Sequence, residues 1–501
     1  MRLTGGAVLV ESLAAHGVEV VFGIPGTHNL GIYASLGIRH VSPRHEQGAG
    51  FAADGYARAS GKPGVCLTTS GPGVLNAATA AAQAYSDSVP MLIVSPGPPT
   101  DHPGHWTGML HEVRSQQGAM AAVTAGSHRV RSVGEISSAV AQAFAAMAAR
   151  PHPRHIEIPY DLLDSPADVR IVDPVKIARP VPGVTMAAGV LASASRPGII
   201  AGGGARGADL GRLNIPVVTT TNGKGVLPED HPYSLGAGLH HDAVASFIAD
   251  CDVVLAIGTE LAPADLWNGP LRFGGPLITV NLDPAQALDA DIALVGDAAA
   301  TVALLAAAAG DPARAALWRS RIAEEAAALG APWEPLTSAL AATLGRDGIL
   351  AGDSTMACYY GTISTLPRYR PGTFLYPTGL GTLGYGLPAA IGAKIARPDV
   401  RVAALHGDGG FMFTAPELAA AAALGLPLAV IVVDNGGYGE IKQKMLARND
   451  TLKAVDLPAP DFAALAEALG CHGVTDPPDL AGTLEKAFTA TRPTVMHLHG
   501  N

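Results

Sequence analysis

One pattern occurs twice in this chain of 501 residues, once near each end. Residues 48–96 and 384–435 each contain, in the same order, a small-residue helical stretch, a basic residue and a proline, an apolar run, a G-x-G turn, an alanine-rich stretch, and a proline before a second apolar run. The turn reads GPG in the first copy and GDG in the second. A repeated unit of this size predicts two copies of one βαβ fold, specialised differently, with a functional site between them.

The rest of the chain shows the same alternation of short β-branched runs and alanine-rich helical stretches. This alternation predicts an α/β protein with mainly parallel sheets. Strands that are apolar on both faces are covered by helices on both sides, as in doubly wound folds. The predicted strands are residues 65–69, 91–95, 198–201, 217–220, 253–257, 277–281, 402–405 and 428–433.

Two alanine- and proline-rich passages, residues 163–185 and 306–335, are predicted to be linkers, the second with a helical middle. They divide the chain into three segments near residues 1–165, 180–330 and 340–501. Each segment is long enough for a domain with its own core, so we predict three doubly wound domains. The two copies of the repeat fall in the first and third of these domains.

Composition and the apolar pattern argue against a nucleic-acid partner and a membrane segment. The net charge of -10 argues against a nucleic-acid partner, which would need a basic surface. Apolar runs such as residues 426–433 are far shorter than the roughly 20 residues that cross a bilayer, and the N-terminus lacks the unbroken apolar stretch of a signal peptide. The 4 cysteines form no CxxC pair that would indicate a zinc knuckle. We therefore expect a cytoplasmic protein without a membrane partner.

The GDG turn carries a lone carboxylate, Asp408, at the end of one apolar run, and Asn435 follows the next run. Parallel strands would bring both side chains to the carboxyl edge of the sheet, where α/β proteins bind ligands. Thr414 and Glu417 match a capping box, which predicts a helix just after the turn whose N–H groups favour an anion. Oxygen ligands together with phosphate oxygens suit Mg²⁺, so we predict a metal-held diphosphate. The alternative is an ordinary strand-to-helix turn capped by Asp408.

The GDG motif with Asn435 resembles the signature of thiamine diphosphate (ThDP) enzymes, and nearly the whole chain resembles their acetolactate synthase and 2-oxo acid decarboxylase branch. That family has a pyrimidine-binding, a middle and a diphosphate-binding domain, in the order of the three segments. The resemblance implies that Asp408, Asn435 and the Gly437 carbonyl hold Mg²⁺. It also implies that residues 378–388 fold the cofactor into a V shape, with the side chain of Leu383 under the thiazolium ring.

Residues 42–51, SPRHEQGAGF, resemble the catalytic glutamate segment of the family. The resemblance makes Glu46 the carboxyl group that hydrogen-bonds the aminopyrimidine ring and promotes loss of the thiazolium C2 proton. The small residues Gly48, Ala49 and Gly50 are expected to let the cofactor ring approach closely. The alternative for Glu46 is a surface residue that begins a helix. The cofactor-binding residues implied are Glu46, Gly71, Gly73, Gly381, Leu383, Gly407, Asp408, Gly409, Asn435 and Gly437.

Oligomerisation and a second cofactor are further questions that the resemblance raises. In this family the glutamate and the diphosphate site belong to different subunits, which implies a homodimer at least and makes a tetramer plausible. Residues 202–207 form a GxGxxG pattern, but residues 219–222, TTTN, lack the acidic residue that a dinucleotide site needs about 20 positions later. Acetolactate synthases bind FAD in this domain; the segment here is compact, and FAD is not expected.

The resemblance implies that a 2-oxo acid loses CO₂ to give an enamine. Decarboxylases protonate the enamine and release an aldehyde, whereas carboligases add it to a second carbonyl compound. The lysine and tryptophan of acetolactate synthases are missing from residues 119–130 and 438–448, which favours a decarboxylase. A carboligase of acetolactate synthase type is the alternative, and a non-catalytic ThDP-fold subunit is a further one.

The substrate is indicated by residues 43–51, 110–112, 156–163 and 438–445, which together resemble the 5-guanidino-2-oxopentanoate decarboxylase group. A guanidinium group needs a carboxylate partner. The candidates are Glu112, Asp101, Glu440 and Asp265, although each is also consistent with a solvated or structural charge. His28 and His111 are the candidate proton donors to the enamine. The predicted substrate pocket consists of Thr27, His28, Thr69, Ser70, Leu110, His111, Glu112 and Glu440.

Overall fold

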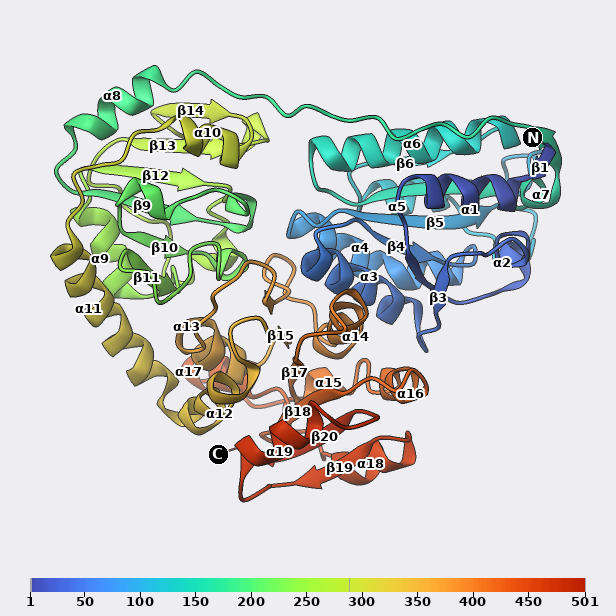
Figure 1. Cartoon of the computed structure of the whole chain (residues 1–501). Helices are drawn as coiled ribbons and strands as arrows, with labels where there is room; N and C mark the ends of the chain where they lie inside the picture. The colour runs from blue at the N-terminus through green and yellow to red at the C-terminus, as the bar shows by residue number, and fades with distance from the viewer. Residues whose placement is uncertain (1, 288, 501) are drawn as a thin grey trace.

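The computed structural model describes residues 2–287 and 289–500, so the outermost residues of the predicted outer domains, Met1 and Asn501, lie outside it. Within the described residues, the strands form three six-stranded parallel sheets and one antiparallel pair, β1 (Arg2–Thr4) with β8 (Pro166–Asp168) (Figure 1). Helices flank each sheet. The predicted α/β class with three doubly wound parallel sheets is confirmed.

The N-terminal and C-terminal sheets have the same topology. Numbered one to six in chain order, the strands of both sheets are arranged 2-1-3-4-6-5. The GPG and GDG turns both follow the third strand, as the repeat predicts. In spatial order, the strands of the N-terminal sheet are β3 (Arg39–Val41), β2 (Val20–Gly23), β4 (Gly64–Leu67), β5 (Met91–Gly97), β7 (Arg154–Pro159) and β6 (Ser127–Arg129). Those of the C-terminal sheet are β16 (Phe374–Leu375), β15 (Ile349–Gly352), β17 (Val402–Gly407), β18 (Leu428–Asp434), β20 (Thr494–His499) and β19 (His472–Thr475).

Helices cover both outer sheets on both faces. In the N-terminal domain they are α1 (Gly5–Ala15), α2 (Leu30–Ala34), α3 (Glu46–Ser60), α4 (Pro72–Ser86), α5 (Gln116–Ala121), α6 (Val133–Ala149) and α7 (Tyr160–Asp164). In the C-terminal domain they are α12 (Glu334–Leu344), α13 (Ile363–Thr365), α14 (Gly386–Ala396), α15 (Asp408–Phe411), α16 (Glu417–Ala423), α17 (Gly439–Ala447), α18 (Phe462–Ala468) and α19 (Leu480–Ala487), with a π-helical turn over Ala357–Thr362.

The two outer domains pack on each other through the small-residue helices of the repeat, α3 and α14. A Cβ at Gly55 would collide with the backbone of Ala389, and one at Gly392 would collide with the Ala52 carbonyl. Glycine is required here because the two helix backbones are in direct contact. One hydrophobic core therefore continues from α3 and α4 to α14, α16 and α18.

The middle sheet has a different order, 3-2-1-4-5-6. A long connection, residues 169–184, joins the middle sheet to the N-terminal domain. The predicted second linker is mostly the helix α11 (Pro312–Gly330) (Figure 1). The strands of the middle sheet are β9 (Pro197–Ala201), β10 (Val217–Thr219), β11 (Ser234–Ala237), β12 (Val253–Ile257), β13 (Leu277–Asn281) and β14 (Ile292–Val295). The helices of this domain are α8 (Thr185–Ser193), α9 (Asp242–Asp250), α10 (Ala298–Leu304) and α11.

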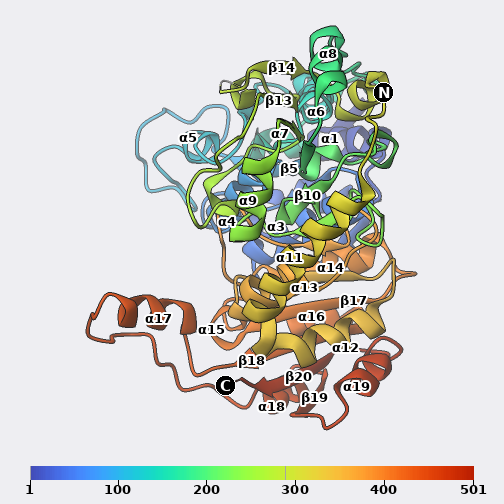
Figure 2. The ribbon, with the colours of Figure 1, turned by 90° about the vertical axis from the view of Figure 1, so that its left-hand side faces the viewer.

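Two segments extend from the body of the molecule on one side, the one that carries α5 and the one that carries α17 (Figure 2). Each follows the fourth strand of an outer sheet, β5 or β18. Among residues 2–287 and 289–500, no helix is both long enough and apolar enough to cross a membrane.

Candidate active site

The carboxyl edge of the C-terminal sheet brings Asp408 and Asn435 together, as the strand pattern predicts. Asp408 begins α15 directly after β17, and Asn435 follows β18, the hydrogen-bonded neighbour of β17. Asp408 is buried. Gly407 is the last residue of β17, and Gly409 lies against Tyr438, where a Cβ would be 2.8 Å from the ring. The turn after the third strand and the turn after the fourth therefore form one compact loop pair.

Three oxygen atoms converge in this loop pair. The side-chain oxygen of Asn435 faces the Gly437 carbonyl oxygen at 3.0 Å and Asp408 Oδ1 at 3.3 Å. Gly437 has a φ of 134°, a conformation that favours glycine. Rotating the amide would let Nδ2 donate to both oxygens. In the orientation shown, the three oxygens face one point with no donor between them, and a hard cation such as Mg²⁺ would satisfy them as part of its near-octahedral oxygen shell. The donor set therefore fits a hard divalent cation.

Electrostatics agree with the fit of a cation at this point. Burial and the neighbouring charge of Asp434 raise the pKa of Asp408, and the N–H groups of Gly409, Asn435 and Gly437 oppose the shift. A buried carboxylate whose charge is disfavoured gains most from a nearby cation.

The segment 378–388 lies beside this loop. A Cβ at Gly410 would be 3.4 Å from Leu383 Cδ2, so the Leu383 side chain is adjacent to α15. Gly381 has a φ of 65° and is exposed. Buried Asp353 accepts hydrogen bonds from the N–H groups of Gly384 (3.1 Å) and Gly386 (3.2 Å). Sequence reasoning missed Asp353, although its position directly after an apolar strand is the signal that identified Asp408.

The Thr414–Glu417 stretch does not form the predicted capping box. The helix α16 begins at Glu417, and Thr414 makes no cap; its hydroxyl donates to the Gly384 carbonyl at 2.8 Å. The carboxylate of Glu417 instead accepts from the backbone of the N-terminal domain, from the N–H groups of Arg44 and His45. The predicted helix does start shortly after the turn, but both motif side chains bind distant parts of the chain.

Glu46 and the GPG turn form a second cluster, in the N-terminal domain. Glu46 is the first residue of α3, and its Oε2 accepts a hydrogen bond of 2.9 Å from Asn76 on α4. A Cβ at Gly73 would be 3.2 Å from Glu46 Oε1, and Gly71 has a φ of 58° that suits glycine. Within the described residues, no hydrogen bond or ion pair joins Glu46 to the loop of Asp408.

The small residues after Glu46 have another role than the predicted approach of a cofactor ring. A Cβ at Gly48 would collide with the carboxylate of Glu417, and one at Gly50 would collide with Ala80 Cβ on α4. Because protein side chains fill the space beside both glycines, these residues permit close packing of α3 against its neighbours. That part of the sequence interpretation was wrong.

Several predicted pocket residues meet next to the GPG turn. His28 Nδ1 is 2.6 Å from Ser70 Oγ, which is 3.4 Å from His111 Nδ1. Burial and the neighbouring His111 lower the pKa of His28. Thr69 lies in the same turn, and its buried hydroxyl has no hydrogen-bond partner among the described residues. The predicted pocket residues Thr27 and Leu110 are exposed at the edge of this cluster.

Comparison with known proteins decides the family. Models of the thiamine pyrophosphate enzyme match its N-terminal TPP binding domain at residues 3–120, its central domain at 184–305 and its C-terminal TPP binding domain at 351–498. The chain belongs to the thiamine pyrophosphate enzyme family. Thiamine pyrophosphate is another name for ThDP, so the resemblance predicted from the GDG and glutamate segments is confirmed.

Relatives within the family include decarboxylases and synthases. The chain is 43% identical to the "Probable 2-ketoarginine decarboxylase AruI" of Pseudomonas aeruginosa over 95% of this chain and 90% of the relative. It is 33% identical to a "Probable acetolactate synthase large subunit" of Methanocaldococcus jannaschii, over 99% and 92% of the two chains. It is 32% identical to the acetolactate synthase isozyme 2 large subunit of Escherichia coli, over 99% and 95%.

Among the candidate guanidinium partners, two carboxylates have other roles in the chain. Burial would raise the pKa of Glu112, but hydrogen bonds from Met109, Thr107 and His102 lower it to about 2. Asp265 accepts from the Thr221 N–H at 3.3 Å in the middle domain, and burial raises its pKa to about 6. Within the described residues, neither carboxylate has a hydrogen bond or ion pair with the loop of Asp408.

Asp101 and Glu440 are the remaining candidates. Asp101 is exposed. Glu440 lies in the first turn of α17, directly after the loop of Asn435, and its Oε2 accepts a hydrogen bond of 2.7 Å from the Tyr360 hydroxyl. Trp267 of the middle domain meets the Tyr360 ring edge-on at 6.2 Å. A carboxylate beside the loop, held by a tyrosine that itself packs on a tryptophan, is a suitable setting for an organic cation.

The glycine pattern of the middle domain lacks the structure of a dinucleotide site, although the sheet has the strand order of such folds. After β9 comes a three-residue turn, Gly203–Ala205, and no α-helix whose N-terminus could face a pyrophosphate. Gly202 and Gly204 pack against Gly258 so closely that a Cβ on either would collide. A cavity of about 690 Å³ lies between this turn and the N-terminal domain, and neither Glu46 nor Asp408 lines it. The expectation that FAD is absent stays a prediction.

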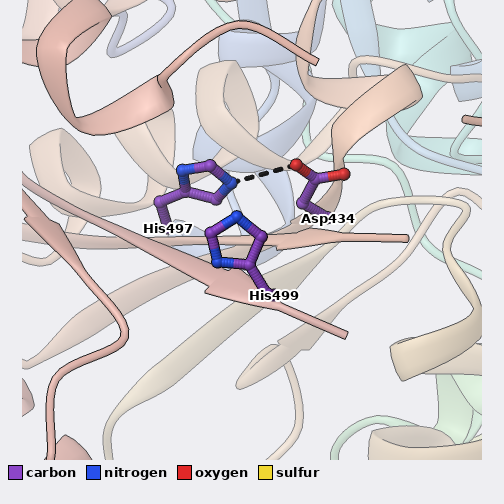
Figure 3. A group of neighbouring side chains, drawn as sticks. All are labelled: Asp434, His497 and His499. Atoms are coloured by element: carbon purple, nitrogen blue, oxygen red, sulfur yellow. Dashed lines mark hydrogen bonds and ion pairs between the residues drawn. The ribbon is translucent and has the colours of Figure 1, made fainter. Parts of the chain in front are cut away.

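A cluster of Asp434, His497 and His499 lies next to Asn435 at the ends of β18 and β20 (Figure 3). Asp434 Oδ2 is 3.1 Å from His497 Nε2, and Oδ1 accepts from the Gly436 N–H at 2.9 Å. His499 Nδ1 is 2.7 Å from Asp476 Oδ2. Through these two hydrogen bonds, the Asp434 carboxylate joins His497 on β20 to the backbone of the turn that contains Asn435 and Gly437. The cluster therefore supports the shape of this turn.

Proposed function

We propose that this protein is a ThDP- and Mg²⁺-dependent decarboxylase that releases an aldehyde from a 2-oxo acid, and that 5-guanidino-2-oxopentanoate is its substrate. The observation that carries the proposal is the convergence of the Asp408, Asn435 and Gly437 oxygens at the carboxyl edge of the sheet, adjacent to Leu383. When bound, ThDP supplies the electron sink for the charge left by departing CO₂.

The chain's own residues would divide the work. Asp408, Asn435 and the Gly437 carbonyl would hold Mg²⁺ and the diphosphate, and Leu383 and the Gly381 carbonyl would contact the rings of the cofactor. Glu46 would hydrogen-bond the pyrimidine ring, and its carboxyl group would supply the acid–base function that the loss of the C2 proton needs. His28, whose lowered pKa keeps its imidazole neutral near pH 7, and His111 handle protons on the substrate side.

A homodimer would complete the site. Glu46 and Asp408 belong to separate clusters of one chain, so a second subunit supplies the missing half of each site. Exposed apolar side chains lie next to both clusters and support this arrangement, since large apolar side chains on a surface mark interaction sites. They are Leu30 and Leu75 near the GPG turn, and Leu380, Met412 and Phe413 near Leu383 and α15.

The substrate proposal rests on the relative and on Glu440. The name of the Pseudomonas aeruginosa relative describes action on 2-ketoarginine, which is 5-guanidino-2-oxopentanoate. Glu440 offers a carboxylate beside the metal loop and is held by Tyr360, whose ring meets Trp267 edge-on. Its ion pair with Lys444, at 3.3 Å, is on the exposed side and can be replaced by a guanidinium.

Product analysis by mass spectrometry tests the proposal. The purified protein with ThDP and Mg²⁺ is offered three substrates in separate reactions: 5-guanidino-2-oxopentanoate, pyruvate, and a 2-oxo acid of similar length whose side chain is uncharged. We expect the guanidino aldehyde and CO₂ from the first, with little turnover of the others. Acetolactate from pyruvate would replace the proposal with the carboligase alternative, to which the acetolactate synthase relatives point.

A further inference from the structure

A buried carboxylate of the C-terminal domain lies against the segment that leads into Glu46. Glu417 is 1% exposed. Its Oε1 accepts from the N–H groups of Arg44 at 2.9 Å and His45 at 3.0 Å, and its Oε2 accepts from Arg44 at 3.1 Å. Arg44 and His45 directly precede α3, whose first residue is Glu46. The carboxylate thus fixes the start of a helix in another domain.

The surroundings of Glu417 match this contact. Carboxylates that accept from N–H groups at the start of a helix form strong hydrogen bonds and interact favourably with the helix dipole. A Cβ at Gly48 would collide with the carboxylate, so the first turn of α3 is shaped to receive it. Burial raises the pKa of Glu417 to about 7, and the N–H groups of Arg44 and His45 oppose the shift.

Residues 414–417 also contact the loop of Leu383, which belongs to the cluster around Asp408. Thr414, three residues before Glu417, donates to the carbonyl of Gly384, the neighbour of Leu383. The segment that follows the GDG turn therefore contacts both the loop of Leu383, which joins β16 to α14, and the start of α3. None of these contacts uses the proposed metal ligands.

We propose that Glu417 is a positioning residue that holds the N-terminus of α3 so that the Glu46 carboxyl group faces the aminopyrimidine ring. This inference rests on the proposed function, which places Glu46 and the metal loop of one chain in two different sites of a dimer. Under that arrangement, the three hydrogen bonds of Glu417 connect the two sites. A change at Glu417 acts on Glu46 of its own chain and leaves the metal loop of that chain intact.

The variant Glu417→Gln removes one acceptor and turns an amide NH₂ toward backbone donors. Glu325→Gln is the matched control, because Glu325 accepts from two consecutive N–H groups, those of Asp242 and Ala243, at the start of α9 in the middle domain. Amide hydrogen exchange of the cofactor-free full chain is measured by mass spectrometry. We expect exchange in residues 44–50 to rise roughly 10-fold in Glu417→Gln and to stay unchanged in the control.

The second measurement is the rate at which the ThDP C2 proton exchanges with D₂O, followed by NMR in the holoenzyme without substrate. We expect Glu417→Gln to lower this rate roughly 100-fold, as misplacement of a catalytic group by about 1 Å does, with unchanged dissociation constants for ThDP and Mg²⁺. Gly48→Ala should displace the same carboxylate, so its effect and that of Glu417→Gln should not add. A wild-type exchange rate in Glu417→Gln, or full additivity, would overturn the proposal.

Mixed dimers separate this inference from the proposed function. Chains with Glu417→Gln and chains with Asp408→Ala are co-expressed with different tags and the mixed dimer is isolated. One of its two sites combines an unperturbed Glu46 segment with an unperturbed metal loop, so C2 exchange should return there. The reference pair is Glu46→Gln with Asp408→Ala. If the reference pair recovers C2 exchange and the Glu417→Gln pair does not, the inference about Glu417 fails and the shared dimer site stands. If neither pair recovers C2 exchange, the shared dimer site is rejected. The amide hydrogen exchange of residues 44–50 then decides the role of Glu417.

Discussion

The N-terminal and C-terminal domains have one strand order and differ where their third and fourth strands end. In the C-terminal domain these ends carry Asp408 and Asn435, whose oxygens converge with the Gly437 carbonyl. In the N-terminal domain the same positions carry the GPG turn and a proline-rich stretch, with Glu46 and the His28–Ser70 pair nearby. The fold thus fixes where a ligand can bind, and a few turn residues decide whether that place holds a metal or handles protons.

The largest expected effect comes from the N-terminal side. Glu46→Gln should lower turnover about 100- to 10,000-fold, the range typical of a lost acid–base group, while ThDP and Mg²⁺ bind as in the wild type. Steady-state kinetics and calorimetric titration measure the two quantities. Wild-type turnover in this variant would remove Glu46 from the chemistry.

A change at the metal loop of the C-terminal domain should affect cofactor binding more than turnover. Asp408→Ala removes a charged oxygen from the metal loop and should weaken Mg²⁺-dependent ThDP binding roughly 100-fold, with activity returning in part at high cofactor concentration. Titration with ThDP at several Mg²⁺ concentrations checks this. Unchanged cofactor affinity would contradict the metal assignment and the contrast between the domains.

The glycines of the two turns offer a matched pair. Gly437 (φ 134°) and Gly71 (φ 58°) both occupy conformations that side chains rarely adopt. Gly437→Ala should weaken Mg²⁺ binding about 10- to 100-fold through strain of about 1–3 kcal/mol in the metal loop. Gly71→Ala should leave Mg²⁺ affinity unchanged and reduce turnover, since a Cβ there would collide with His111. Equal losses of Mg²⁺ affinity would show that the turns do not have separate roles.

The carboxylates that follow the fourth strands provide a smaller contrast. Glu440→Gln should lower kcat/KM for 5-guanidino-2-oxopentanoate roughly 10- to 100-fold, the effect of losing a charged hydrogen-bond partner. The kcat/KM for a 2-oxo acid with an uncharged side chain should not change. Glu112→Gln should impair both substrates alike, because Glu112 holds its own loop through Thr107 and Met109. Equal losses for both substrates in Glu440→Gln would count against a guanidinium partner.

The smallest effect concerns stability and pH. Burial raises the pKa of Glu417 to about 7 in the folded protein, above its ordinary value, although Arg44 opposes the shift. The folded state then binds the proton more tightly than the unfolded state, so this group's contribution is most favourable at acidic pH and declines as the pH rises toward 7. Urea unfolding from pH 5 to pH 8 should show wild-type stability falling by about 1–3 kcal/mol relative to Glu417→Gln. A pH-independent difference would refute the shift.

Sequence reasoning succeeded where local pattern and burial agree. Residues 253–257 and 277–281 were predicted as strands and are strands over those residues, because a fully buried parallel strand is apolar on both faces. The neighbourhood of Asp408 and Asn435 follows from the same logic, since both directly follow buried strands that pair. The roles of these residues in binding the cofactor stay predictions.

Sequence reasoning failed where a local motif has a distant partner. Thr414 and Glu417 have the spacing of a capping box, yet Glu417 binds Arg44 and His45 more than 370 positions away, which no short-range pattern can indicate. The glycine pattern at 202–207 failed for a related reason. Glycines that allow backbone packing against Gly258 look the same in sequence as glycines that admit a phosphate.

The contact between α3 and α14 also bears on how such a chain arose. These helices occupy equivalent positions in the two copies of the repeat, and each presents its glycines to the other. A surface that binds its own equivalent is the hallmark of an isologous interface in a two-fold symmetric dimer. Duplication and fusion of a single domain that paired with itself through this helix would produce the same arrangement, with the two faces of one symmetric interface free to differ.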